Sequence, residues 1–196
     1  MTIGRFFHAA ILLANGKVLI TGGLSAGTNL QSAEIYDPTT KTFTSAGNMT
    51  AVRMGHTSTL LPSGKVLLAG GGNGFGASAT NTAELFDPTA GTFTATNVMT
   101  YQRSLHTATL LSSGQVLLAG GASNFFAGGA SSSISAAELF DPSTGNFTQT
   151  ADMTALRESH TATLLQTGDV LVVGGADGTI GYSQPTIVFD TAELYQ

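Results

Sequence analysis

Three kinds of chemically active side chain recur in this chain at fixed places, four times each. Arginine and histidine come together in an Arg-x-x-His motif, and glutamate stands in an Ala-Glu-(Leu/Ile)-(Phe/Tyr) motif. Imidazoles can bind a metal ion, and paired carboxylates can perform acid–base catalysis. The sets are Arg5, Arg53, Arg103 and Arg157; His8, His56, His106 and His160; and Glu34, Glu84, Glu138 and Glu193.

The repetition itself argues against a metal site or a catalytic site at these positions. A catalytic centre is singular, whereas a scaffold position returns with every repeat. We expect each histidine to make one hydrogen bond between repeats and to bind no metal. Each glutamate should pair with the arginine of its repeat or with backbone amides, because a buried carboxylate needs compensation. For the arginines two interpretations stay open: clamps between repeats, or a ring of guanidinium groups that binds carboxylates of a partner.

The elements that carry these residues are short strands. In residues 49–98, turn residues such as Pro62–Lys65 and Asp87–Gly91 separate four β-branched or apolar runs. The runs are His56–Leu61, Val66–Ala69, Ala83–Phe86 and Thr92–Thr94. Four such strands joined by hairpins make one antiparallel sheet, which buries both apolar faces only by packing against neighbouring sheets. No segment has helical periodicity.

A repeat period near 50 residues with a Gly-Gly pair in each unit is typical of propeller blades. The arginines are 48, 50 and 54 residues apart, and each histidine precedes its Gly-Gly pair by 14 residues. The sequence therefore predicts an all-β propeller of four-stranded antiparallel blades. We expect one domain over residues 1–196, with repeats of about 1–48, 49–98, 99–152 and 153–196.

Three segments of the repeat make the chain resemble the kelch family along its whole length. They are the Gly-Gly pair after an apolar strand, the Glu-x-(Phe/Tyr)-Asp-Pro segment and the Met-x-x-x-Arg junction. Within that family, the chain resembles the bacterial and galactose-oxidase-like branch more than the others. Kelch repeats usually carry Trp on the fourth strand, where this chain has Phe43, Phe93 and Phe147. The resemblance implies a propeller, which in this family usually closes with six or seven blades.

Both ends of the sequence bear on how such a ring would close. Met1–Arg5 aligns with Met49–Arg53, so the chain begins at a repeat junction, and Ala192–Tyr195 aligns with the third strand of a blade. The fourth blade should therefore lack its outer strand. We expect either a fragment of a larger propeller or a homodimer in which two chains close one eight-bladed ring.

The stretch between the Gly-Gly pair and the glutamate varies in length, with spacings of 12, 14, 18 and 19 residues. Length variation on one face of a repeat fold usually marks a binding face. Aromatic side chains there could stack on a sugar or anchor a peptide, or they could pack on neighbouring blades. The candidate binding residues are Asn73, Phe75, Asn124, Phe125, Phe126 and Tyr182, together with Arg53, Arg103 and Arg157.

Composition excludes several classes of function. The net charge is −5, with 7 Lys and Arg residues against 12 Asp and Glu residues, so no basic patch is available for nucleic acid. No apolar run is long enough for a membrane-spanning helix. The lack of cysteine rules out disulfides, thiolate metal sites and a cysteine nucleophile. Low charge with many Thr and Asn residues favours an extracytoplasmic or secreted protein.

The favoured function is a non-catalytic scaffold that binds a protein segment or a glycan on the face of the variable loops and needs no cofactor. A self-associating structural unit that forms an eight-bladed ring is the first alternative. A fragment of a galactose-oxidase-like enzyme is the second, although the resemblance implies a Cys cross-linked to a Tyr and clustered copper ligands in such enzymes. This chain has no Cys, and its histidines are periodic.

Overall fold

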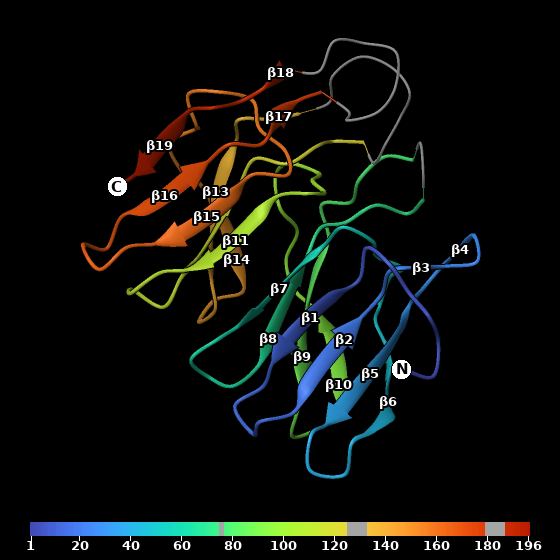
Figure 1. Ribbon diagram of the computed structural model, residues 1–196. Helices are drawn as coiled ribbons and strands as arrows, with labels where there is room; N and C mark the ends of the chain where they lie inside the picture. Colours follow the sequence, from blue (N-terminus) through green and yellow to red (C-terminus); the bar gives the residue numbers. More distant parts are fainter. Residues whose placement is uncertain (75–76, 125–132, 179–186) are drawn as a thin grey trace.

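The computed structural model describes residues 1–74, 77–124, 133–178 and 187–196 of the chain. In these residues the regular elements are β-strands, and most belong to four antiparallel sheets that follow one another in sequence order (Figure 1). This arrangement confirms the predicted all-β fold of propeller blades. No helix in the described part of the chain is long and apolar enough to cross a membrane.

The four sheets, which we call blades 1 to 4, share one strand order. Blade 1 contains β1 (Ala9–Leu12), β2 (Val18–Thr21), β5 (Ser32–Asp37) and β6 (Thr42–Asn48). Blade 2 contains β7 (Thr57–Leu60), β8 (Val66–Ala69), β9 (Ala83–Asp87) and β10 (Thr92–Ala95). Blade 3 contains β11 (Thr107–Leu110), β12 (Val116–Ala119), β13 (Ala137–Asp141) and β14 (Asn146–Gln149).

Blade 4 has three paired strands among the described residues, as the sequence predicts. They are β15 (Thr161–Leu164), β16 (Val170–Val173) and β19 (Ala192–Tyr195). Two short hairpins lie in the loops that follow the second strands of blades 1 and 4. Their strands are β3 (Leu24–Ser25) with β4 (Thr28–Asn29), and β17 (Ala176–Asp177) with β18 (Ile187–Val188).

The Asp-Pro hairpin between the third and fourth strands is shaped by its aspartate. In blade 2, Asp87 Oδ1 accepts a hydrogen bond from Thr89 N (2.9 Å), and the Asp87 carbonyl accepts one from Gly91 N (2.8 Å). This turn places Phe86 directly across the ladder from Phe93, and the two ring centroids lie 4.7 Å apart. The phenylalanine that replaces the usual tryptophan therefore packs on the third strand of its own blade.

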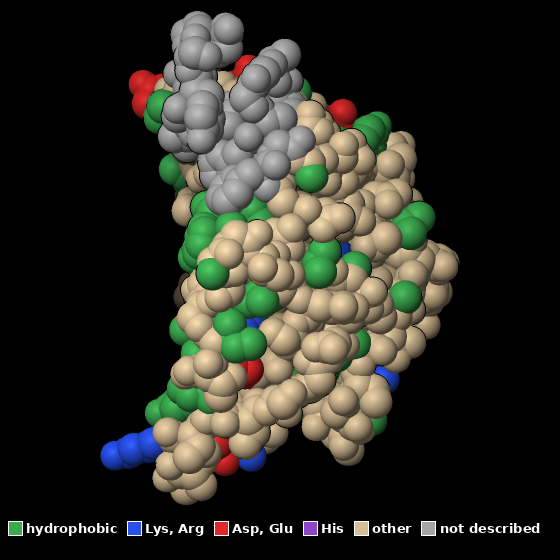
Figure 2. Space-filling model, turned by 90° about the vertical axis from the view of Figure 1, so that its right-hand side faces the viewer, with side chains coloured by type: hydrophobic (Ala, Val, Ile, Leu, Met, Phe, Trp, Pro, Cys, Tyr) green, Lys and Arg blue, Asp and Glu red, His purple; other side chains and the backbone are tan. Residues whose placement is uncertain are grey.

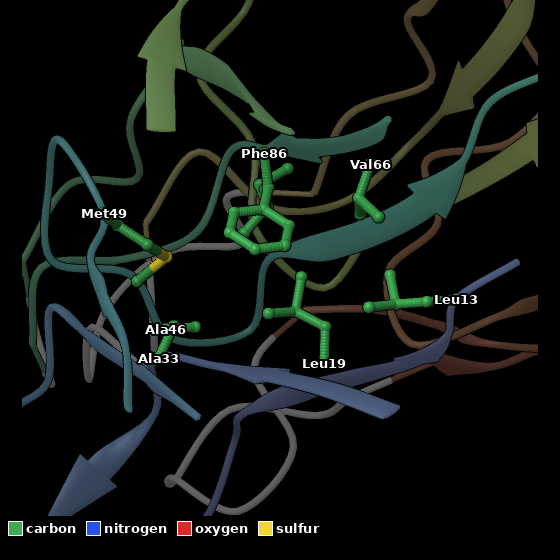
Figure 3. Close-up of a cluster of buried hydrophobic side chains, with 8 residues drawn as sticks. Leu13, Leu19, Ala33, Ala46, Met49, Val66 and Phe86 are labelled. Atoms are coloured by element: carbon green, nitrogen blue, oxygen red, sulfur yellow. The ribbon is translucent and has the colours of Figure 1, made fainter. Parts of the chain in front are cut away.

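Consecutive blades pack face to face around a common axis. Their first strands β1, β7, β11 and β15 are neighbours in space, each next to the following one. A cluster of apolar side chains fills each space between two blades. In the first cluster, Leu13 and Leu19 of blade 1 point toward Val66 and Phe86 of blade 2 (Figure 3). Burial on both faces explains why a strand such as β8 is apolar at every position.

Candidate functional site

Three of the four repeat arginines, Arg53, Arg103 and Arg157, connect two blades. The carbonyl oxygen of Arg53 accepts a hydrogen bond from Gly23 N of blade 1 (2.8 Å), while the side chain reaches into blade 2. There the guanidinium group donates to Glu84 Oε1 (2.7 Å) and to the Gly70 carbonyl (2.7 Å). The equivalent ion pairs are Arg5–Glu34 (3.0 Å), Arg103–Glu138 (2.8 Å) and Arg157–Glu193 (2.8 Å). The ion pair closes within one repeat, so the arginine backbone makes the link between blades.

The threonine of the Met-Thr junction holds the same glutamate. Thr50 N donates to Glu84 Oε2 at 2.7 Å, and Thr2 N donates to Glu34 Oε1 at 2.8 Å. Burial of Glu34 opposes its ionisation, but the hydrogen bonds from Thr2 and the charge of Arg5 outweigh burial and lower the pKa of this carboxyl. Both oxygens of each carboxylate are thus engaged in the framework, which leaves neither for proton transfer to a substrate.

The three arginines proposed for the binding surface have inaccessible side chains. Those of Arg53 and Arg103 are 0% exposed, and that of Arg157 is nearly so. Their guanidinium donors are directed at carboxylates and backbone carbonyls inside the blades. This placement corrects the expectation that they contribute charge to a ligand site, and it favours the clamp.

The Gly-Gly pair is required by contact with the following blade. A Cβ on Gly70 would lie 2.3 Å from the carbonyl oxygen of Arg103, which belongs to blade 3. The next residue, Gly71, donates its N–H to that same oxygen (2.9 Å) at a φ of 98°. Any side chain at Gly70 would displace the clamp, and a left-handed φ disfavours one at Gly71. The Gly-Gly pair therefore accommodates the backbone carbonyl of the next repeat arginine, and we call its first residue the socket glycine.

Three of the repeated histidines add a side-chain hydrogen bond to the joints between blades. His56 Nε2 lies 2.8 Å from Thr21 Oγ1 of blade 1, and His106 Nε2 lies 3.0 Å from Thr57 Oγ1 of blade 2. The third pair is His160 Nε2 and Thr107 Oγ1, at 3.0 Å. Which atom donates depends on the histidine tautomer. Each joint thus combines backbone hydrogen bonds, one imidazole–hydroxyl hydrogen bond and one apolar cluster.

These histidines are neutral in the folded protein. Burial, and after it the charges of Arg53 and His8, lower the pKa of His56 to about 3. Burial and the charge of Arg157 lower the pKa of His160 to about 4. The pKa of His106 also lies well below its usual range, mainly because of burial. A cationic imidazole is therefore disfavoured at each joint.

Blade 1 supplies its hydroxyl from a different strand than the other blades. Thr57 directly follows its histidine, and the equivalent residue in blade 1 is Ala9. Thr21 lies directly across the ladder from Ala9, in the place that Ala69 has opposite Thr57. The hydroxyl has moved from one strand to its partner, while the hydrogen bond to the histidine of the next blade is kept.

The variable loops of consecutive blades contact one another. Asn29 Nδ2 donates to the Asn73 carbonyl (3.0 Å), and Ala79 N donates to the Ser123 carbonyl (2.8 Å). A third link runs from Gly178 N to Ser133 Oγ at 3.1 Å. We call this surface the loop rim, and define it as the described residues within 22–31, 72–82, 122–135 and 176–191. The rim is continuous across all four blades.

Two of the predicted binding residues can be placed on the loop rim. Asn73 is exposed, and Asn124 is half-buried and forms an isolated β-bridge with Ser78. The aromatic candidates Phe75, Phe125, Phe126 and Tyr182 lie outside the described residues. In the view of Figure 2, which includes part of this rim, uncharged side chains and backbone cover most of the surface. Such a surface suits a ligand that offers hydroxyl or amide groups.

Glu158 is a candidate that the periodic pattern concealed. Its equivalents in the other repeats are Phe6, Met54 and Ser104. Glu158 is buried at the base of the loop rim, where its N–H donates to the Ala176 carbonyl (2.9 Å). Burial, and then the negative charge of Asp177, raise the pKa of Glu158 to about 7. The signal that could have found it is a charged residue at a position that carries none elsewhere.

Comparison with known proteins agrees with this architecture. Residues 5–50 match the kelch motif, and no curated protein matches the sequence. A solved fungal alcohol oxidase of the AA5 family, in complex with copper, aligns over 90% of this chain with a TM-score of 0.64 and 22% identity. The chain covers 50% of that oxidase, and the likeness concerns the fold. The first repeat thus matches the kelch motif, and the chain as a whole is similar in fold to a propeller-containing oxidase.

Proposed function

We propose that this kelch propeller domain is a non-catalytic scaffold that binds a protein segment or a glycan at the loop rim. The proposal rests on a difference between two sets of residues, the repeated residues that hold the blades together and the variable residues of the loop rim. The repeated Arg, Glu and Thr side chains are engaged in the blades and their joints. Length variation, in contrast, is confined to loops that lie side by side on one face.

The charge of the rim supports a neutral ligand over a polyanionic one. The arginines Arg53, Arg103 and Arg157 are buried in ion pairs. Asn and Ser groups remain at the rim, and Asn73 is exposed there. Amide and hydroxyl groups exchange hydrogen bonds with sugar hydroxyls or with a peptide backbone without a large desolvation cost.

The likeness to a copper oxidase raises the question whether copper would fit here. The histidine Nε2 atoms of three joints face threonine hydroxyls of neighbouring blades. In the part of the chain that the structure describes, no three His, Cys, Asp or Glu side chains are grouped to hold a metal ion. The described residues therefore do not fit a copper centre, and we propose no oxidation step.

Binding to glycan and peptide arrays tests the proposal. The protein would be compared with a Phe125→Ala/Phe126→Ala double variant on the loop between blade 3 strands β12 and β13. A matched control, Ser112→Ala/Ser113→Ala, changes the β11–β12 hairpin on the opposite face of the same blade. We expect a ligand whose affinity falls at least tenfold in the first variant and is unchanged in the control.

Two results would overturn the proposal. One is a ligand whose affinity is equal in all three proteins, which would move the site away from the rim. The other is stoichiometric copper retained after loading and dialysis, measured by mass spectrometry of the metal, together with alcohol oxidation. Circular dichroism of the three proteins would show that the substitutions leave the fold intact.

A further inference from the structure

The link between blades 2 and 3 carries an exposed aromatic side chain that the other links lack. Tyr101 in this link is 40% exposed, and Val98 nearby is 56% exposed. The residues at the place of Tyr101 in the other repeats are Ile3, Ala51 and Ala155. Since the same link is built elsewhere from smaller or aliphatic residues, the repeat framework does not require the ring of Tyr101.

The backbone beneath this ring is held by the buried framework. Thr100 N donates to Glu138 Oε1 of blade 3 at 2.7 Å, and Tyr101 N donates to Glu138 Oε2 at 3.4 Å. Glu138 is itself fully buried in its ion pair with Arg103. The Tyr101 ring therefore extends from a fixed backbone, so a ligand that binds to it has less conformational freedom to remove.

The same link borders the loop rim of blade 2. Met99 N donates to the Asn81 carbonyl (2.8 Å), and Asn81 Nδ2 donates to the Met99 carbonyl (3.1 Å). Arg103 N donates to the Thr80 carbonyl at 3.2 Å. Because residues 80 and 81 belong to the loop rim, these bonds place Tyr101 at the edge of the rim, on the face where loop length varies.

The surroundings of Tyr101 in the chain are polar but uncharged. Residues 92–102 contain no charged side chain, and Gln102 is exposed beside Tyr101. Asn97 is exposed as well, and its Nδ2 donates to Asn146 Oδ1 on the outer strand of blade 3 (2.6 Å), which fixes the orientation of the Asn97 amide. The link thus combines one aromatic ring with neutral hydrogen-bonding groups.

We propose that Tyr101 is a stacking residue for a neutral sugar ring, so that the ligand of the loop rim is a glycan. A pyranose has an apolar C–H face that packs on an aromatic ring, and its hydroxyls exchange hydrogen bonds with amides such as those of Asn97 and Gln102. An apolar peptide side chain on the same ring would leave these amides without partners. The inference rests on the proposed function, because it specifies the ligand class of that surface.

The first test measures binding of the full chain to immobilised neutral oligosaccharides of glucose, mannose and N-acetylglucosamine. Tyr101→Ala should lower the affinity for the bound saccharide about tenfold, because the stacked contact is lost. Tyr101→Phe keeps the ring and should stay within about twofold of the wild type. A matched control, Leu164→Ala, removes an exposed apolar side chain at the hairpin end of β15, and should leave the affinity unchanged.

A second readout uses the absence of tryptophan from the chain, since tyrosine then dominates the near-ultraviolet absorbance. A sugar stacked on Tyr101 changes the surroundings of one of the four tyrosines, so a saturating saccharide should produce a tyrosine difference spectrum. That spectrum should be lost in Tyr101→Phe, although this variant still binds. Unchanged circular dichroism and melting temperature of the variants would show that lost binding is not lost folding.

The outcomes distinguish this inference from the proposed function. Equal saccharide affinity in the wild type and in Tyr101→Ala overturns the role of Tyr101, as does a difference spectrum that persists in Tyr101→Phe. The Phe125→Ala/Phe126→Ala variant still tests the loop rim in either case. A protein that binds a peptide at the rim and no saccharide overturns the glycan while the rim proposal stands. A protein that binds neither class of ligand overturns both.

Discussion

The joint between blades 2 and 3 and the outer face of blade 4 contain the same residue types in different surroundings. At Gly70 an arginine carbonyl of the next blade would lie 2.3 Å from an added Cβ, whereas at Gly174 the nearest atom is the Phe189 carbonyl oxygen at 3.7 Å. Contact with the neighbouring blade therefore accounts for much of the repeat motif. The same substitution should therefore have different consequences in blade 2 and in blade 4.

The largest difference is expected at the buried ion pair. Glu84→Ala leaves Arg53 with an uncompensated charge in a site where both side chains are fully buried. We expect a loss of about 3–5 kcal/mol in the free energy of unfolding, measured by urea denaturation. Glu193→Ala in blade 4 should cost clearly less, because the Glu193 side chain is 14% exposed and solvent can reach its partner. Equal losses at the two positions would contradict this account.

A smaller difference is expected at the socket glycine. Gly70→Ala forces a methyl group against the carbonyl of Arg103, and should cost about 3 kcal/mol of stability. Gly174→Ala retains the cost of a left-handed backbone, but its methyl group would make only an ordinary van der Waals contact with the Phe189 carbonyl oxygen at 3.7 Å, so about 1 kcal/mol is expected. Thermal unfolding of both variants measures the difference.

The histidine joints should make the folded state sensitive to acid. His56 and His160 have pKa values of about 3 and about 4 in the folded protein, against an ordinary value of 6.5. Their contribution to stability is therefore complete above pH 6.5 and decreases as the pH falls toward these values. We expect His56→Asn to flatten the decrease between pH 6.5 and 5 by up to about 1.4 kcal/mol per pH unit. An unchanged slope would show that His56 does not titrate on unfolding.

The smallest effect on stability is expected at Glu158, whose ionisation destabilises the fold as the pH rises rather than as it falls. Its pKa is raised to about 7 in the folded state from an ordinary 4.5, so its ionisation between these values destabilises the fold as the pH rises. Glu158→Met, which copies the equivalent Met54, should stabilise the protein by about 1 kcal/mol at pH 8. The same variant at pH 4 serves as the control, and there the gain should vanish.

Much of the framework could be predicted because its determinants are local. Short apolar runs that alternate with turns such as Asp-Pro specify strands and hairpins. A charged residue that recurs beside apolar strands requires a partner of opposite charge. The pairing of Arg53 with Glu84 follows from that requirement. The three paired strands of blade 4 in the described part of the chain likewise agree with the alignment of Ala192–Tyr195 with third strands.

The contacts between blades could not be predicted from the sequence, because they depend on which backbone atoms lie next to one another in the folded chain. No pattern indicates that the carbonyl of Arg103 would occupy the space beside Gly70, or that arginine side chains would turn inward from the loop face. Glu158 could not be found from the repeat pattern, because that pattern consists of residues that recur and Glu158 occurs in one repeat. The aromatic candidates lie outside the described residues, so their role in binding stays a prediction. They are Phe75, Phe125, Phe126 and Tyr182.

The exchange of Ala9 and Thr21 in blade 1 has a consequence for how these repeats diverge. When the hydroxyl of a hydrogen bond can come from either of two paired strands, no single column of a repeat alignment has to contain threonine. Substitutions can then accumulate in compensating pairs while the joint persists. In such a propeller, the location of the hydroxyl in the folded structure is conserved. The sequence position of the residue that provides it can change.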